Sequence, residues 1–391
     1  MLMPDVSVVV PCYNCENFID KTVNSLLNQT ILPKEIILID DNSLDNTIKV
    51  IKKLENKNKI IRVFNFKENK GPSFTRNYGV DKSKGQYILF MDSDDIASPY
   101  LIEKSFRNLN ELNKDNKNKW LLSYTSYIQI DENDNTIGSI IKGIQVEPEE
   151  VLGYEFLRNT IITTSGVIIY KSTFYEALRF NENLSYSEDW DLWLRVATLG
   201  GFSYVDEPLI KVRRRRNSLS SKLKNMIEGE KAILKQYSLD FIEEAVSKRK
   251  LSNDINTCDF VSMLFRLDYL EEGFEKLKKL LQNSEYYNVY FLLGVYYTKK
   301  HKLDLALDSF NKTVELKENH GAALNNLGII YCLIGQVEKG KKLLDKVLEM
   351  YPNYLDAKHN LNMISRENGI TYDSIKFTFR ELRNKLINYE I

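Results

Sequence analysis

The chain is poor in the residues and segments that mark several classes of protein. Its 391 residues include only 4 cysteines and 3 histidines, too few for a disulfide framework. Lys and Arg together number 54, as do Asp and Glu, so the basic excess of a typical nucleic-acid-binding protein is missing. No apolar run approaches the ~18 residues of a membrane-spanning helix, and residues 1–5 lack the basic start of a signal peptide. These absences predict a cytoplasmic protein and leave open attachment to the inner face of a membrane through a partner.

Two of the four cysteines form a C-x-x-C motif, Cys12 to Cys15. Such a pair can be redox-active or can supply half of a zinc site. The sequence has no second pair, and the three histidines (His301, His320 and His359) all lie near the other end of the chain. The motif therefore lacks the context that a functional interpretation requires.

The N-terminal half alternates short apolar strands with amphipathic helices. Strands are expected at 6–10, 35–39, 60–66 and 87–91, and helices at 18–27, 45–54 and 73–80. Continuous apolar strands joined by helices predict an α/β domain with a mostly parallel sheet and helices on both faces. Hydrophobic residues make up 43% of the chain and charged residues 28%, which is ordinary for a globular protein with more than one domain.

Three of these strands end in polar clusters. The clusters are Tyr-Asn at 13–14, Asp-Asp at 40–41 and Asp-Ser-Asp-Asp at 92–95. Sheets of this kind bind ligands at the carboxyl ends of their strands, so the clusters predict one binding site. The carboxylates at 92–95 repel one another, and a divalent cation with oxygen ligands relieves that repulsion. The alternative for this cluster is a solvated turn with a helix N-cap.

Six stretches of the chain together resemble family 2 glycosyltransferases of the GT-A fold. They are V-V-V-P-C-Y-N at 8–14, S-L-L-N-Q-T at 25–30, E-I-I-L-I-D-D-N-S at 35–43, G-P-S-F-T-R-N at 71–77, F-M-D-S-D-D at 90–95 and S-E-D-W-D-L-W at 187–193. Their order and spacing agree with the family, which makes the set far more specific than any one motif. The resemblance implies a GT-A domain over residues 1–222 that transfers a sugar from a nucleotide-diphosphate donor.

The resemblance also implies which residues hold the nucleotide. Pro11 and Tyr13 would line the pocket for base and ribose, and Asp41 would accept the imide N–H of uracil. A carboxylate suits thymine or guanine too, so UDP is the preferred nucleotide among several. Arg76 would lie against the base or the diphosphate. Considered alone, Tyr13 also fits simple packing, Asp41 a helix cap and Arg76 the protein surface.

In the same family the acidic cluster is a D-x-D motif that binds Mn2+ or Mg2+. By resemblance Asp92 would face the ribose and the metal, and Asp94 would be a direct metal ligand. Asp95 is a further candidate, either as a ligand or as a residue that orients the other two.

Catalysis is expected from the Glu188-Asp189 pair, which matches the catalytic acids of the family. Inverting transfer needs a base that removes the proton of the acceptor hydroxyl as its oxygen attacks the anomeric carbon. By position Asp189 resembles that base, and Glu188 or Asp191 would orient the acceptor. A cap on the following helix is the alternative role for Asp189, and the two roles are compatible.

Four consecutive arginines at 213–216 precede Asn-Ser-Leu-Ser at 217–220. Related enzymes carry a loop here that closes over the diphosphate, often with a metal-binding histidine where this chain has Arg215. Because arginine cannot ligate a metal, the metal site is expected to have fewer protein ligands. Arg213 or Arg215 would instead neutralise the leaving diphosphate.

The C-terminal part repeats with a period of 34 residues. Gly294 and Gly328 stand 34 apart within matching L-G…Y…A/G…F/L patterns, which indicates tetratricopeptide repeats. Residues 254–286 resemble a weaker earlier unit. The sequence therefore predicts a helical linker at 223–252 and an all-α repeat domain at 253–391.

Together these features predict an inverting, metal-dependent transferase of hexosyl or N-acetylhexosaminyl groups. Repeats of this kind bind peptides, which favours a protein acceptor or protein partner recruited by the repeat groove. The alternatives are a polysaccharide or lipid-linked glycan acceptor, with the repeats used for oligomerisation, and a non-catalytic binding module. The sugar itself stays open, because its pocket is expected from residues 120–170, where no recognisable pattern occurs.

Overall fold

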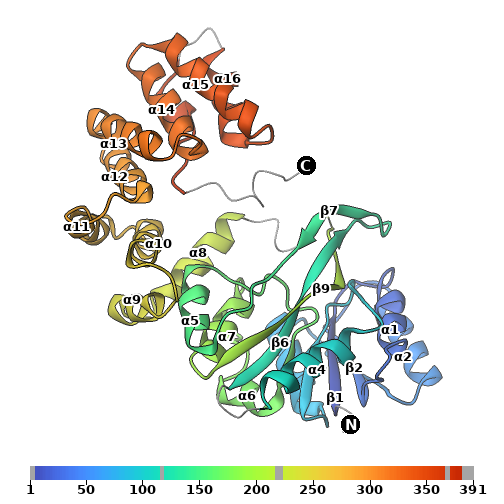
Figure 1. Ribbon diagram of the computed structural model, residues 1–391. Coiled ribbons are helices and arrows are strands. Elements are labelled where there is room, and N and C mark those ends of the chain that lie inside the picture. The colour runs from blue at the N-terminus through green and yellow to red at the C-terminus, as the bar shows by residue number, and fades with distance from the viewer. Residues whose placement is uncertain (1–4, 115–118, 216–222, 366–369, 381–391) are drawn as a thin grey trace. The chain divides into compact units, whose positions relative to one another are not determined.

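The computed structural model describes residues 5–114, 119–215, 223–365 and 370–380, and the chain falls into two compact units (Figure 1). Contacts divide the chain between Arg249 and Lys250. Helices α8 (Leu223–Leu234) and α9 (Leu239–Ser247) occupy the stretch expected as a linker and belong to the first unit. The domain boundaries drawn from the sequence stay a prediction.

The described part of the first unit contains one nine-stranded sheet. Its strands are β1 (Val6–Cys12), β2 (Glu35–Asp40), β3 (Ile61–Asn65), β4 (Tyr87–Phe90), β5 (Ile96–Ala97), β6 (Trp120–Ile130), β7 (Thr136–Ile141), β8 (Ile168–Tyr170) and β9 (Gly201–Arg213). Their order is β3-β2-β1-β4-β8-β6-β9-β5, with β7 paired to β6. The first four strands are parallel, as expected, and their carboxyl ends share one edge of the sheet.

The α/β fold is confirmed, and the sheet is mixed: its longest pairings are parallel, and short antiparallel pairings join β8, β7 and β5 to it. Strand β8 lies between β4 and β6 and runs antiparallel to both, while β6 and β9 are parallel to each other. Apolar patterning predicts that such strands are buried, but it does not fix their direction.

Helices cover both faces of the sheet and enclose two separate hydrophobic cores. They are α1 (Ile19–Leu27), α2 (Thr47–Lys57), α3 (Pro72–Lys82), α4 (Leu101–Leu112), α5 (Pro148–Leu157), α6 (Lys171–Glu176) and α7 (Glu188–Ala197). Alternate side chains of β1 show the division, because successive residues of a strand point to opposite faces. Val8 and Val10 pack with Val23 of α1 in one core, whereas Val9 packs with Val80 of α3 and Trp193 of α7 in the other.

The second unit is all-helical in its described residues, as the sequence predicts. Its helices are α10 (Asn253–Arg266), α11 (Leu270–Leu280), α12 (Tyr287–Lys299), α13 (Leu303–Leu316), α14 (Gly321–Leu333), α15 (Val337–Met350), α16 (Leu355–Ile364) and the short 3-10 helix η2 (Tyr372–Ser374). Consecutive helices pack as pairs, α12 with α13 and α14 with α15. The periodic glycines make these pairs close: a Cβ on Gly294 would stand 2.5 Å from the ring of Phe310, and one on Gly328 would stand 2.9 Å from Leu344. The tetratricopeptide identity itself stays a prediction.

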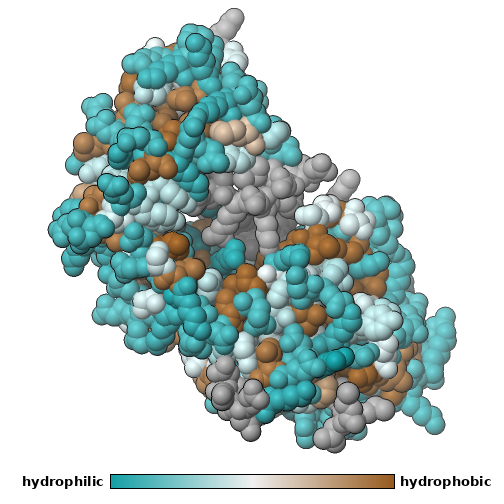
Figure 2. Space-filling view, viewed as in Figure 1, coloured by the Kyte–Doolittle hydropathy of each residue, from teal (hydrophilic) through white to brown (hydrophobic). Residues whose placement is uncertain are grey.

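The described residues include no candidate membrane-spanning helix and no disulfide. In the described ranges no helix combines the length and the apolar character needed to cross a membrane. The face shown in Figure 2 is mostly hydrophilic, with hydrophobic patches scattered over both units. All four cysteines are buried thiols without a disulfide, and Cys12 and Cys15 belong to the core beneath the sheet.

Candidate active site

The loops that follow β1 and β2 are joined at the carboxyl edge of the sheet. The backbone N–H of Asn14 donates to Ser43 Oγ at 3.0 Å, and the amide oxygen of Asn14 accepts from the N–H of Leu44 at 2.8 Å. Asn14 and Asn42 both have positive φ angles, 47° and 60°, which asparagine tolerates better than most residues. These two turns place the predicted nucleotide-binding residues on one surface.

Asp41 is buried beside the predicted base pocket, and its carboxylate is held by backbone N–H groups. The N–H of Lys70 donates to Oδ1 at 2.7 Å and that of Gly71 to Oδ2 at 2.8 Å. Burial raises the pKa of Asp41, and the two N–H groups oppose that shift. The side chain of Thr75 also interacts with this carboxylate, and a carboxylate has about four lone-pair sites, so it keeps room for one further donor. Tyr13 is exposed and Pro11 is half-buried, which leaves the tyrosine ring available for stacking.

Arg76 joins the two acidic motifs that lie almost a hundred residues apart in the chain. Its guanidinium donates to Asp92 Oδ1 at 2.8 Å and to Glu188 Oε1 at 3.2 Å, and it lies over the ring of Phe180. Arg76 is only 6% exposed. It therefore sits between the predicted metal site and the predicted catalytic pair, with Asp92 and Glu188 fixed on either side of it.

The three aspartates after β4 have different environments. Asp92 is about one-third exposed and Asp94 is half-buried, whereas Asp95 is buried. Both oxygens of Asp95 accept hydrogen bonds from the protein, from Ser165 Oγ at 2.5 Å and from the N–H of Arg213 at 2.8 Å. Ser165 Oγ also accepts from the N–H of Asp92 at 2.9 Å. Asp95 and Ser165 thus fix the turn that presents the other two carboxylates.

Asp94 is paired with Arg215, whose Nε stands 2.8 Å from Asp94 Oδ2. Burial raises the pKa of Asp94, and the charge of Arg215 opposes that shift. Arg215 is half-exposed and also lies over the ring of Phe18. It is therefore a cation beside the D-x-D motif that solvent, or a bound phosphate, can reach.

Arg213 has a different environment from Arg215, although the sequence offered both as partners of the diphosphate. Its side chain is fully buried, and its nitrogens donate to the carbonyl oxygens of Asp94 at 2.9 Å and Asp131 at 2.7 Å and to Asp134 Oδ1 at 2.5 Å. These contacts tie the end of β9 to the acidic turn and to the β6–β7 connection. Residues 216–222, including the Asn-Ser-Leu-Ser segment, lie outside the described part of the chain.

Asp92 and Asp94 are the residues that could hold a divalent cation, and each is paired with an arginine, Arg76 and Arg215. Among the residues that the structure describes, no three His, Cys, Asp or Glu side chains are close enough to form a metal cage. Asp92 and Asp94 nevertheless offer two carboxylates that are not fully buried, which is the ligand number typical of Mg2+ sites completed by water and phosphate oxygens.

Asp189 is the second residue of helix α7, and its carboxyl group is buried beside Glu188. Burial and the neighbouring charge of Glu188 raise the pKa of Asp189 to about 7. Its Oδ1 accepts from the N–H of Trp190 in the first turn of α7 at 2.7 Å, although Ser187 is the N-cap of the helix, and its Oδ2 accepts from Asn159 Nδ2 at 3.3 Å. A carboxyl group that titrates near neutrality is matched to proton transfer at physiological pH.

Three polar residues near this pair were missed by the sequence analysis: Asn159, Glu155 and Ser165. Burial raises the pKa of Glu155 to about 8, and its carboxyl accepts from the N–H of Thr160 at 3.2 Å. Glu155 also contributes to the electrostatic environment of Asp189. A glutamate in an otherwise apolar helical segment was a usable signal, whereas single Asn and Ser residues in a loop carried none.

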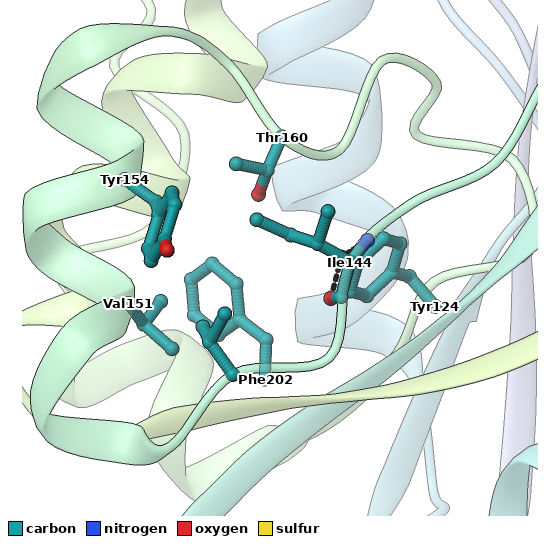
Figure 3. Close-up of a pocket in the computed structure, with 7 residues that line it drawn as sticks. Tyr124, Ile144, Val151, Tyr154, Thr160 and Phe202 are labelled. Atoms are coloured by element: carbon teal, nitrogen blue, oxygen red, sulfur yellow. Dashed lines mark hydrogen bonds between the residues drawn. The ribbon is translucent and has the colours of Figure 1, made fainter. Parts of the chain in front are cut away.

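An adjoining pocket is built from the part of the chain that gave no sequence pattern. Figure 3 shows Tyr124, Ile144, Val151, Tyr154, Thr160 and Phe202 around it. The hydroxyl of Tyr124 donates to the carbonyl of Ile144 at 2.6 Å, which fixes the loop that follows β7. A second hollow on the other side of Tyr124 extends to Ser165, next to the acidic turn. The free space between the side chains of the first pocket is about 10 Å³, enough for about one water molecule and too small for a sugar.

Comparison with known proteins supplies the family. The model of glycosyl transferase family 2 matches residues 7–118. An uncharacterized glycosyltransferase of Haemophilus influenzae is 28% identical over 300 residues, which cover 75% of this chain and 88% of that protein. An uncharacterized glycosyltransferase of Rickettsia typhi is 30% identical over 232 residues, 59% of this chain and 70% of that protein. Two other Rickettsia relatives are longer, and the chain covers 33% and 32% of their length.

Among solved structures, residues 1–349 of TarS from S. aureus in complex with UDP-GlcNAc are similar with a TM-score of 0.47 and 18% sequence identity. The match covers 89% of this chain and 91% of that one.

Proposed function

The chain belongs to glycosyl transferase family 2, and from that membership we propose that it transfers a sugar from a nucleotide-diphosphate donor, with UDP as the nucleotide, to an acceptor hydroxyl with inversion. The observation that carries the proposal is the position of Arg76 between Asp92 and Glu188. It brings the D-x-D motif and the catalytic pair into one site, so that a donor held at the first would present its anomeric carbon near the second.

Asp189 is the base of this reaction. It takes the proton of the acceptor hydroxyl while the hydroxyl oxygen forms a bond to the anomeric carbon, and the bond from that carbon to the diphosphate breaks. The leaving group departs as a nucleoside diphosphate. The pKa of about 7 supports this role, since a base must be ionised at working pH and still able to hold a proton. Asn159 keeps Asp189 oriented through its hydrogen bond to Oδ2.

Asp92 and Asp94 would hold Mn2+ or Mg2+ together with the oxygens of the diphosphate. When bound, the ion would neutralise the negative charge that grows on the leaving group. Arg215 supports the same charge from the protein side, because its half-exposed guanidinium already lies beside Asp94. Arg213 and Asp95 position this group, since both are buried and fully engaged with protein atoms.

The nucleotide lies over Tyr13 and against Asp41 in this proposal. An exposed tyrosine ring supplies a stacking surface for a base. A carboxylate accepts the imide N–H of uracil, and Asp41 keeps lone pairs for it beyond those used by Lys70 and Gly71. Pro11 borders the same pocket from the end of β1.

We place a protein acceptor first, recruited through the helical second unit. The helices of that unit pair with the close approach at Gly294 and Gly328 that a tetratricopeptide array requires. A glycan acceptor, with the second unit used for association between copies, is the competing outcome of the experiment below.

The proposal is tested by incubating the purified chain with a panel of nucleotide sugars and MnCl2, with and without EDTA, and measuring released nucleoside diphosphate. We expect hydrolysis or transfer with one UDP-sugar, lost in EDTA and lost in Asp189→Asn. Asp308→Asn, an exposed aspartate on α13, is the matched control and should keep the rate. Full turnover by Asp189→Asn would refute the assigned base. Mass spectrometry of proteins and of glycans from the same reaction then separates the two kinds of acceptor.

A further inference from the structure

The second unit holds part of its own chain on the face formed by the first helices of its pairs. After η2 the backbone of Ile375 is extended, with φ −109° and ψ 164°. The segment 370–380 touches α12 through the hydroxyl of Tyr372, which donates to the carbonyl of Thr298 at 2.8 Å, and it touches α14 and α16 through asparagines. We call this segment the tail and the face that holds it the tail groove.

Two asparagines clamp the tail by its backbone alone. Asn360 on α16 donates to the carbonyl of Lys376 at 2.9 Å and accepts from the N–H of the same residue at 2.8 Å. Asn326 on α14 does the same with Thr378, with both distances 2.8 Å. In a β-sheet, the N–H and C=O groups of such a residue would bond to a neighbouring strand. Here the side-chain amide of one asparagine supplies both partners. Both asparagines are 0% exposed.

The spacing of the clamps matches the spacing of an extended chain. Asn326 and Asn360 stand 34 residues apart, which is the helical repeat, and they engage tail residues that are two apart. Residues two apart in an extended chain present their N–H and C=O groups on the same edge. The asparagines of two successive repeats therefore bind Thr378 and Lys376, whose backbone groups lie on the same edge of the extended tail. This is a regular site for an extended polypeptide, and its affinity comes from main-chain groups that every sequence except proline supplies.

The groove also binds the side chain of one tail residue, Thr378. The hydroxyl of Thr378 donates to Asp356 Oδ2 at 2.9 Å, accepts from Asn325 Nδ2 at 3.3 Å and contacts the hydroxyl of Tyr354. Thr378 is buried, whereas Lys376, Phe379 and Arg380 around it are exposed. The groove therefore selects a hydroxyl residue at this position and tolerates variation beside it.

We propose that the tail groove binds an extended segment of a partner protein, with Thr or Ser at the position of Thr378, and that the tail is its built-in competitor. Empty, the groove would leave two buried amides without partners, so it requires an extended occupant. The tail is also held by Tyr372, by the buried Ile375 and by Phe377, which packs against the core of the unit, whereas Lys376, Phe379 and Arg380 are exposed. Another segment can therefore replace it if it offers the same backbone and similar side chains at the buried positions. The use of this site to recruit an acceptor rests on the proposed function, but the binding itself does not.

The first measurement is hydrogen exchange of the full chain. We expect the N–H groups of Lys376 and Thr378 to be protected, and this protection to be lost in the double variant Asn326→Ala/Asn360→Ala. Asn311→Ala is the matched control, an exposed asparagine on α13, and should leave the protection unchanged. Free exchange of both N–H groups in the unaltered chain would overturn the assignment of the tail to the groove.

The second measurement uses a fluorescent synthetic peptide with the sequence of residues 370–380 as the probe. Its binding is followed by anisotropy against the full chain and against the full-length variant Thr378→Pro, in which the tail lacks the N–H that Asn326 accepts. We expect the peptide to bind Thr378→Pro at least several-fold more tightly than the unaltered chain, because the competitor is weakened. Adding Asn326→Ala should reduce peptide binding roughly tenfold or more.

Each other outcome contradicts the proposal. Equal affinity for the unaltered chain and for Thr378→Pro would show that the tail does not compete. Equal affinity with and without Asn326 would show that the amides do not hold the peptide. A dimer that Thr378→Pro dissolves would assign the groove to the tail of a second copy. Donor hydrolysis, measured on the same variants, should be unchanged throughout, so a failure of the groove and a failure of the proposed transferase are told apart.

Discussion

Sugar transfer should depend on the ionisation of Asp189 in a range where ordinary aspartates no longer titrate. Only the carboxylate accepts a proton, so the active fraction rises with pH. With a pKa of about 7, roughly half of the molecules are active at pH 7 and roughly 1% at pH 5, a fall of about 50-fold. An aspartate with an unperturbed pKa near ~3.9 would lose less than about a tenth of its activity over the same interval.

The fall of activity toward low pH forms the acid limb of the pH–rate profile. Two substitutions should move this limb in opposite directions. Glu188→Gln removes the neighbouring negative charge that raises the pKa of Asp189, so the limb should shift to lower pH. Asn159→Ala removes a donor that favours the charged carboxylate, so the limb should shift to higher pH. Asp308→Asn, far from the site in sequence and exposed, should leave it in place.

The assay is turnover at saturating donor and Mn2+ between pH 5 and 8.5, with donor binding measured separately at each pH so that phosphate and metal ionisation are accounted for. A flat profile between pH 5 and 7 would refute Asp189 as the base with a raised pKa. Shifts of the same sign in Glu188→Gln and Asn159→Ala would refute the electrostatic explanation even if the limb itself is present.

Three further predictions concern the metal site, the joining arginine and the helical unit. Asp94→Ala should weaken UDP binding when Mn2+ is present but leave binding in EDTA unchanged; calorimetric titration in both buffers checks this, and an equal loss in both contradicts it. Arg76→Met should lower turnover more than tenfold and the free energy of unfolding by about 2 kcal/mol, because it removes the partner of two carboxylates, whereas Arg107→Met on the exposed face of α4 should change neither. Gly294→Val should destabilise the second unit by about 1–3 kcal/mol in calorimetry, because its side chain would overlap Phe310, and should leave the donor KM unchanged.

The parallel half of the sheet and the position of its ligand edge were within reach of the sequence. Apolar runs such as 6–10 and 35–39 are buried on both faces, so their hydrophobicity is continuous and easily recognised. Polar residues that follow such runs must gather at the carboxyl edge, and Asp41, Asp92 and Asp94 do. In this part of the sheet the sequence pattern of a strand predicts where its end lies, because short loops join each strand to the next helix.

The remainder of the site depends on contacts between distant segments, which leave no local pattern. Ser165 orients Asp92 and Asp95 from 73 and 70 residues away along the chain, and Asn159 contacts Asp189 from a loop without periodicity. Arg213 and Arg215 belong to the same run, yet Arg213 is buried at the end of β9, whereas Arg215 lies in the loop after the strand and is about one-third exposed.

The asparagine pair on α14 and α16 shows the opposite case, a signal that was present and overlooked. Asn326 and Asn360 fall at the same place in the 34-residue period, where core packing alone would favour an apolar side chain. An amide that recurs at a buried repeat position is evidence for a polar occupant of the face. The sequence pattern could have named both residues before their contacts were known.

Recognition through main-chain groups has a consequence for how partners of this protein would evolve. A segment held by two amide clamps can exchange its exposed side chains and stay bound, provided that it avoids proline at the clamped positions and keeps the hydroxyl and the apolar side chains that are buried. Homology searches would then overlook true partners, since little of their sequence is under constraint. A display library of random extended peptides, scored for depletion of proline, would reveal the binding rule more directly than any search for a shared motif.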